Sequence, residues 1–155
     1  MTTRVTKWAV PALAALGLVD AGYLSILHWQ GEAPPCWGYA GCAQVNSSVY
    51  ATIFGVPVAA LGGLLYIVLL SLGIWRLLGS KLIWPYSTLL LNALTLAATV
   101  FMGYLTGVEL FVLRALCYWC LGMAAISLLL LALTLWDSWS FASKADGWPY
   151  PDKPN

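Results

Sequence analysis

The residues of this sequence that could most clearly do chemistry are four cysteines, which form two pairs. Cys117 and Cys120 make a C-x-x-C motif at the start of the last long apolar run, and five residues separate Cys36 from Cys42. Two thiols at C-x-x-C spacing lie on adjacent turns of one helix face, where they can form a disulfide and open it again. The positive end of the helix dipole and the charge of Arg114 favour a thiolate there. The motif therefore predicts a redox-active pair rather than two small buried hydrophobic residues.

The pair Cys36 and Cys42 lies in a segment rich in turn-forming residues. Gly38 and Gly41, between the two thiols, let the chain bend sharply, as a pair that exchanges partners requires. A fixed disulfide that stabilises the loop is the alternative, and such disulfides are ordinary in extracellular segments. Because a second pair is present, we favour a relay in which thiol–disulfide exchange passes electrons from one pair to the other.

The composition indicates an integral membrane protein. Of the 155 residues, 61% are hydrophobic and 8% are charged, and the mean hydropathy is +0.83. A membrane-spanning helix needs roughly 20 mainly apolar residues, and four such runs occur, at about 8–28, 53–75, 83–105 and 115–136. We therefore predict an all-α bundle of four transmembrane helices in a single domain, residues 1–140, followed by a polar cytoplasmic tail, residues 141–155.

Two loops are expected on the side of the membrane that carries the cysteines. The first contains a short surface helix, which Asn46, Ser47 or Ser48 can cap. The second is a short loop at 107–113.

The basic residues predict the orientation of the bundle. Six of the seven, all except Arg114, lie before the first span, between the second and third, or after the fourth. The positive-inside rule then places both termini in the cytoplasm and all four cysteines at the outer face of the cell (inner or plasma) membrane, where disulfides persist. The net charge of +1 indicates no nucleic-acid partner.

Two further places in the apolar spans are candidates for function. Asp20 lies well inside the first span, and a carboxyl at that depth either handles protons or fixes helix packing, for example by a hydrogen bond to Asn92. Met123 and Ala124, three and four residues after Cys120, place a small and pliable surface beneath that sulfur. A flat ligand fits there, and plain helix packing is the alternative.

The position of the second pair suggests the electron acceptor. The loop pair can meet a soluble protein, whereas Cys117 and Cys120 lie at the membrane boundary and can meet a molecule dissolved in lipid. A membrane-soluble two-electron acceptor is a quinone. The sequence therefore predicts electron transfer from protein thiols to quinone.

Four features in this order resemble the vitamin K epoxide reductase family over nearly the whole chain. They are Cys36-x5-Cys42, Ser48-Val49-Tyr50-Ala51, Phe54-Gly55-Val56-Pro57 with Ala59, and Cys117-x-x-Cys120 at the start of the fourth helix. The resemblance implies that Cys36 exchanges with a thioredoxin-like partner and that Cys42 passes electrons to Cys117. It also implies that Cys120 faces the quinone ring and that Ser48 lines or polarises the site.

Two differences from the family pattern refine the expected reaction. The Asn and Tyr with which vertebrate members hold the vitamin K head group correspond to Ala51 and Ala124 here. A bacterial-type thiol oxidase that reduces ubiquinone or menaquinone is therefore expected rather than a vitamin K epoxide reductase. Many bacterial relatives carry a fused thioredoxin-like domain, and this chain is too short to include one, so the partner is expected to be a separate protein.

Two alternative interpretations remain open. The disulfide-bond formation protein B family performs the same chemistry on another four-helix bundle, but its C-x-x-C belongs to the first outer loop, the reverse of the order here. A bundle without enzyme activity could use the four cysteines structurally or as a thiolate metal site, which requires all four sulfurs to converge. We expect no metal, because the lone histidine, His28, gives such a site little support.

Overall fold

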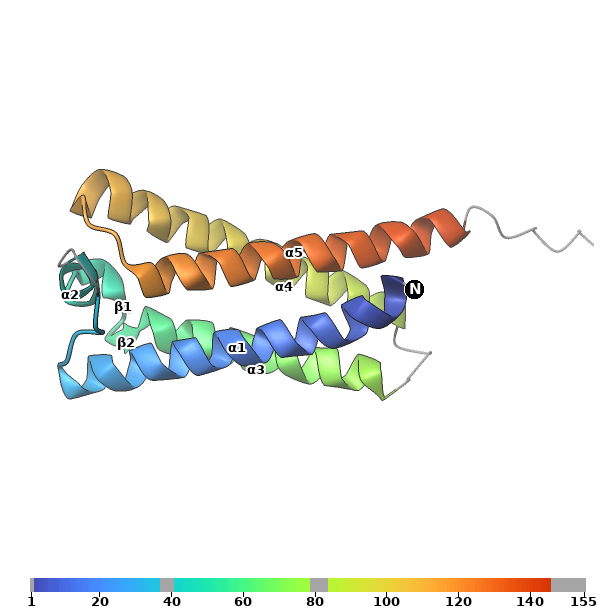
Figure 1. The fold of residues 1–155 in the computed structure, drawn as a ribbon, viewed down its shortest axis with the longest axis horizontal. Helices are drawn as coiled ribbons and strands as arrows, with labels where there is room; N and C mark the ends of the chain where they lie inside the picture. The colour runs from blue at the N-terminus through green and yellow to red at the C-terminus, as the bar shows by residue number, and fades with distance from the viewer. Residues whose placement is uncertain (1, 37–40, 79–83, 146–155) are drawn as a thin grey trace, which may run out of the picture.

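The computed structural model describes residues 2–36, 41–78 and 84–145, and most of them form four long helices. Figure 1 shows these helices lying alongside one another in an elongated bundle. Each is long and apolar enough to cross a membrane. The structure confirms the predicted all-α bundle of a multi-pass membrane protein. The four helices are α1 (Thr2–Gln30), α3 (Val58–Leu77), α4 (Trp84–Gly107) and α5 (Tyr118–Ala145).

The short elements gather at one end of the bundle, which we call the cysteine end because all four cysteines lie there (Figure 1). The predicted short helix of the first loop is present there, together with a 3-10 turn and a two-stranded antiparallel hairpin. A π-helical segment continues α4 at the same end. These elements are α2 (Gly41–Asn46), η1 (Val49–Ala51), β1 (Thr52–Ile53), β2 (Val56–Pro57) and η3 (Val108–Leu113).

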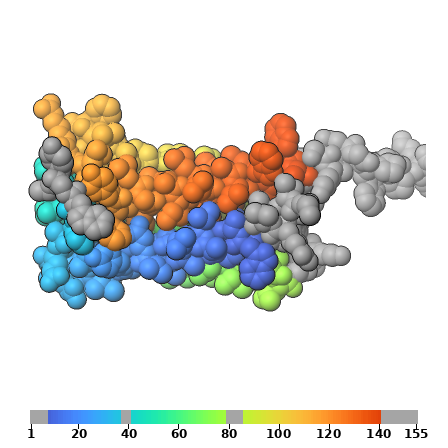
Figure 2. Space-filling model, viewed as in Figure 1, coloured from blue at the N-terminus to red at the C-terminus, as the bar shows by residue number. Residues whose placement is uncertain are grey.

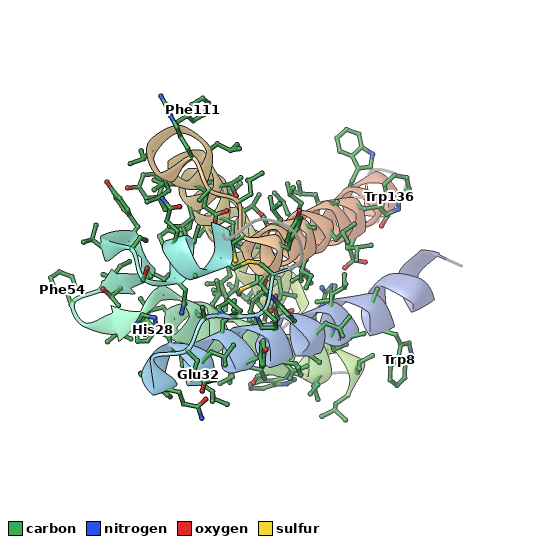
Figure 3. All side chains as sticks on the ribbon, turned by 60° about the vertical axis from the view of Figure 1, so that its left-hand side comes forward. Trp8, His28, Glu32, Phe54, Phe111 and Trp136 are labelled. Atoms are coloured by element: carbon green, nitrogen blue, oxygen red, sulfur yellow. A yellow bond between two sulfur atoms is a disulfide. The ribbon has the colours of Figure 1, made fainter. Side chains whose placement is uncertain are left out.

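The hairpin explains why the second long helix begins later than predicted. The predicted span started at 53, but α3 starts at Val58. Phe54 and Gly55, at the tip of the hairpin, have positive φ angles of 51° and 79°, which are incompatible with a helix. The side chain of Phe54 is fully exposed and points away from the bundle (Figure 3).

The third and fourth helices also differ from their predicted limits. The segment expected to be a loop at 107–113 is η3, and the left-handed conformation of Arg114 (φ 49°) ends it. The last helix then begins at Tyr118 rather than 115. It runs to Ala145 rather than 136, because no proline interrupts the chain before Pro149.

Small residues allow α1 to pack closely against α3. A β-carbon at Gly63 would lie 3.5 Å from Cβ of Ala21, and one at Gly73 would lie 3.3 Å from Cβ of Pro11. Close approach of this kind is how helices associate in lipid, where no hydrophobic effect drives them together. Figure 2 shows the side chains of α1 and α5 also meeting along most of one face.

Polar contacts link the other helices. Thr95 and Thr134 share a buried hydroxyl–hydroxyl hydrogen bond of 3.1 Å between α4 and α5. Arg76 of α3 pairs with Asp137 of α5 at the end opposite the cysteines. The bundle therefore holds the cysteine end on helices that are connected by packing and by polar contacts.

We predict that Gly17→Ala destabilises the bundle. A β-carbon at Gly17 would overlap the ring of Tyr66, which is buried and whose hydroxyl donates a 3.5 Å hydrogen bond to the Met123 carbonyl. Because the ring has little room to move, the overlap costs about 1–3 kcal/mol. The measurement is the free energy of unfolding from a denaturing-detergent titration.

Gly22→Ala is the matched control for this prediction. It lies in the same helix, and a β-carbon there meets nothing within 4 Å. Both variants gain the same helix propensity, so the difference between them isolates the overlap with Tyr66. Equal stability of the two variants would contradict the predicted packing.

Candidate redox site

The four cysteines form a disulfide and a pair of free thiols. Cys36 and Cys42, which we call the loop pair, are joined. Cys117 and Cys120, which we call the motif pair, are free. Figure 3 shows sulfur atoms gathered where α2 meets the start of α5.

The loop pair is held close to the motif pair by the docking of α2 on the chain segment before α5. A β-carbon at Gly41 would overlap the carbonyl oxygen of Leu116, so the two backbones are in direct contact. The Gln44 side chain donates a 3.1 Å hydrogen bond to the Leu113 carbonyl. Cys42, the residue after Gly41, has no exposed surface. The buried half of the loop disulfide is therefore next to the segment that leads into Cys117.

The first turn of α5 also contacts the segment just before Cys36. The indole N–H of Trp119 donates a 3.1 Å hydrogen bond to the carbonyl of Pro35, the residue before Cys36. The Trp119 ring also packs against Tyr23 of α1, with ring centroids 5.0 Å apart. Trp119, inside the C-x-x-C motif, thus fixes the position of Cys36 relative to the motif pair.

Cys117 occupies the N-terminal cap of α5. Its carbonyl accepts a 3.0 Å hydrogen bond from the N–H of Leu121, and its side chain is 2% exposed. The interaction with the Cys120 thiol lowers the pKa of Cys117, and the N–H groups of Cys120 and Trp119 act in the same direction, against the opposing effects of burial and of the negative charge of Glu109. This geometry favours a thiolate at Cys117, as the helix N-terminus predicted.

The charged group beside the motif pair is Glu109, which the sequence analysis did not single out. Its carboxylate accepts a 3.2 Å hydrogen bond from the N–H of Cys117 and lies beside the thiol of Cys120. Arg114, which was expected to provide a positive charge, is exposed on the connection between η3 and α5. The local charge at the motif pair is therefore that of a buried carboxylate.

A cavity opens beside the motif pair at the cysteine end. The empty space within it, which includes open solvent at its mouth, is about 750 Å³. Its walls are mainly apolar, with a few polar groups. The lining residues from the first half of the chain are Leu24, His28, Pro34, Val45, Asn46, Ser48, Tyr50, Ala51, Pro57, Val58 and Ala59. Those from the second half are Met102, Leu105, Val108, Glu109, Leu113, Cys117, Cys120 and Met123.

Three of the four residues predicted to line the quinone site border this cavity. Ser48, Ala51 and Met123 are among the lining residues, and Ala124 is not. Successive residues on a helix point about 100° apart, so Met123 faces the cavity while its neighbour turns away from it. Ser48, one of the three predicted cap residues, occupies the N-cap position of η1, but its hydroxyl donates to the Val45 carbonyl, so no side-chain cap hydrogen bond forms.

Asp20 lies in the bundle but is not among the residues that line the cavity. Its Oδ2 would be 3.9 Å from a β-carbon at Gly122, and its buried Oδ1 has no hydrogen-bond partner. The predicted hydrogen bond to Asn92 is wrong, because the Asn92 amide donates to the Ser138 hydroxyl at 2.8 Å. Whether Asp20 handles protons stays a prediction.

The comparison with known families agrees with this arrangement. The model described as the vitamin K epoxide reductase family matches residues 8–135. The chain belongs to this family. The matched region contains both cysteine pairs and every residue that lines the cavity. A comparison with the curated proteins found none that matches the chain.

Membership of the vitamin K epoxide reductase family establishes the general class of activity. Its members are membrane oxidoreductases that use cysteines and act on disulfides with a quinone as co-substrate. Within the described residues, no group of three or more His, Cys, Asp or Glu side chains could hold a metal ion.

Two polar residues of the cavity were missed by sequence reasoning as site residues. Glu109 lies in the apolar stretch Val108-Glu109-Leu110-Phe111, where an acidic residue is expensive and marks a functional candidate, the argument that singled out Asp20. His28 was considered only as a metal ligand, and it lines the cavity from the last turn of α1.

Proposed function

We propose that this protein is a membrane thiol oxidase that supports disulfide-bond formation. A thioredoxin-like protein, separate from this chain, delivers electrons to Cys36 and Cys42. The electrons pass to Cys117 and Cys120 and then to a membrane quinone.

The observation that carries this proposal is the sequence of contacts from the loop pair to the cavity. Gly41 brings the buried Cys42 next to the segment that leads into Cys117, and Cys117 lies at the start of α5, one helical turn before Cys120, with both residues lining the cavity. Cys36 and Cys120 differ in the reactants that can reach them. Cys36 is partly exposed and can meet a protein, and Cys120 borders a mainly apolar space.

The lining of the cavity suits a quinone head group. The walls are largely apolar, as a lipid-soluble ring requires, and a few polar groups stand beside Cys120. When bound, the quinone supplies an acceptor for two electrons and two protons. The cavity opens at the cysteine end of a bundle whose helices are long enough to cross the bilayer.

Each cysteine of the chain takes part in a different exchange step of the relay. A partner thiolate attacks Cys36, Cys42 leaves, and the partner's second thiol then releases the mixed disulfide, so that the loop pair is reduced. The Cys42 thiolate next attacks the disulfide of the motif pair at Cys117 and releases Cys120. Cys36 then attacks Cys42, which re-forms the loop disulfide and releases Cys117, so that the motif pair is reduced. The lowered pKa of Cys117 makes it a good thiolate for forming the disulfide again when electrons leave the motif pair.

The same proposal includes an orientation in the membrane. The distribution of basic residues places the cysteine end at the outer face of the cell membrane and both termini in the cytoplasm. A partner protein in the oxidising outer compartment then has direct access to Cys36.

A quinone is favoured over vitamin K epoxide as the physiological substrate. Ala51 lines the cavity where vertebrate members have the Asn that holds the vitamin K head group. A methyl group cannot donate a hydrogen bond, so this wall of the cavity lacks that recognition element.

The test is anaerobic reduction of ubiquinone and menaquinone by the purified protein in detergent, driven by a reduced thioredoxin-like protein. We expect turnover in the parent and its loss in Cys36→Ser, because that variant cannot accept electrons from the partner. A well-folded parent that reduces neither quinone with a range of partners would contradict the proposed function.

A further inference from the structure

We propose that Glu109 is the proton acceptor for the Cys120 thiol and hands this proton to a quinone oxygen in the cavity. This inference rests on the proposed quinone reduction and adds a catalytic residue to it. The carboxylate contacts the reacting thiol, and the electron relay described above does not use it.

Glu109 is held in place from two sides. Its backbone carbonyl accepts hydrogen bonds from the N–H of Arg114 and, at 3.0 Å, from that of Ala115, which closes the end of η3. Its carboxylate accepts a hydrogen bond from the N–H of Cys117 at the start of α5. N–H groups in the first turn of a helix have no partner within the helix, and Glu109 provides one. One residue thus ends one helix and caps the next, so its carboxylate has little freedom to move.

The carboxylate lies where a proton acceptor is needed. Glu109 is 3% exposed, lies beside the Cys120 thiol and lines the same cavity as that residue, while its carboxylate is fixed by the N–H of Cys117. A general base must be within hydrogen-bond reach of the proton that it takes. A buried carboxylate in an apolar span is also costly, and capping Cys117 alone could be done by a neutral side chain.

The other titratable groups at the cavity are placed differently. His28 of α1 and Tyr50 of η1 line it, and Arg114 is exposed beyond η3. The Glu109 carboxylate instead accepts the N–H of Cys117 and lines the cavity together with Cys120. Cys117 becomes the other half of the disulfide, so Glu109 is the group that can carry the proton away.

The motif pair loses two electrons and two protons as an S–S bond forms between Cys117 and Cys120. Glu109 takes the Cys120 proton and passes it to one quinone oxygen. The Cys117 proton leaves to water at the cysteine end, and the second quinone oxygen takes a proton from that water. Dithiol and quinone become disulfide and quinol, and Glu109 returns to the carboxylate.

The first test follows the proton in a single turnover. The protein is reduced and mixed anaerobically with a short-chain ubiquinone, and the rate at which the motif pair is oxidised is followed against pH. We expect a rate that changes little across neutral pH, because the reacting state keeps the Cys120 proton on Glu109 for delivery to the quinone. In Glu109→Gln the thiolate must form by losing its proton to the buffer, so the rate should rise by about tenfold per pH unit. Glu32→Gln, which removes an exposed carboxylate at the same end of the bundle, should behave like the parent.

The second test measures quinone reduction. Glu109→Gln keeps an oxygen that can accept the Cys117 N–H, and it should lower kcat at neutral pH by about a hundredfold or more. Exchange between the loop pair and the partner should be unchanged, and Glu32→Gln should turn over like the parent.

Two outcomes would overturn the inference. One is a rise of about tenfold per pH unit in the oxidation rate of the parent, which decides the question even if Glu109→Gln does not fold. The other is parental kcat in Glu109→Gln. A parent that reduces no quinone contradicts the proposed function instead, whereas a parent that reduces quinone with either of these two results contradicts only the role of Glu109.

Discussion

Replacing Cys120 with serine is expected to abolish quinone reduction and to leave the loop pair able to exchange with its partner. Cys120 and Cys117 both border the cavity, and Cys117 is almost fully buried. Without the second thiol the motif pair cannot form a disulfide, so two electrons cannot leave it together. We expect turnover to fall by about a thousandfold or more, measured as anaerobic quinone reduction.

Cys36→Ser distinguishes this result from general damage. Both variants should lose turnover. In Cys120→Ser, however, the loop disulfide should still oxidise the reduced partner, measured as partner disulfide formed in a quenched exchange assay. Cys36→Ser should form none. The two substitutions are chemically identical and affect opposite ends of the relay. Parental turnover in Cys120→Ser would remove this thiol from the mechanism.

Features that depend on local composition could be predicted from the sequence. Long apolar runs predict membrane helices because each helix satisfies its own backbone hydrogen bonds in lipid. The C-x-x-C spacing of Cys117 and Cys120 likewise predicted their position at the start of a helix, which needs no knowledge of the rest of the fold.

Features that depend on backbone geometry could not be predicted in this way. The hairpin at Phe54 and Gly55 lies within residues apolar enough to continue the helix, so hydropathy alone gives no boundary. The contact of Glu109 with Cys117, eight residues later, exists because the left-handed Arg114 turns the chain back. Hydropathy averages over such single residues and does not register them.

Gly41 illustrates the same limit at the site itself. The sequence suggested that this glycine lets the loop bend. Its φ angle is not in the left-handed region, and it begins α2. The structure instead requires a glycine here because the backbone of α2 touches the carbonyl of Leu116. A contact between segments so far apart in the chain leaves no pattern in the local sequence.

We expect Gly41→Ala to slow electron transfer from the loop pair to the motif pair by about a hundredfold. The added β-carbon would overlap the Leu116 carbonyl, and because backbone cannot rotate away as a side chain can, α2 must move. Cys42 is the next residue and moves with it, so its thiolate no longer approaches Cys117 in line. Misplacement of reacting atoms by about 1 Å can cost roughly a hundredfold in rate. The measurement is the rate at which a reduced loop pair reduces the disulfide of the motif pair in a single turnover.

Gly103→Ala is the matched control, because a β-carbon at that position in α4 meets nothing within 4 Å. It should transfer electrons at the parental rate. Exchange of Cys36 with the partner should also be little changed in Gly41→Ala, since the altered contact lies on the side of α2 that faces α5. A parental transfer rate in Gly41→Ala would show that the relay tolerates movement of α2, and that the close backbone contact does not set the distance between the two pairs.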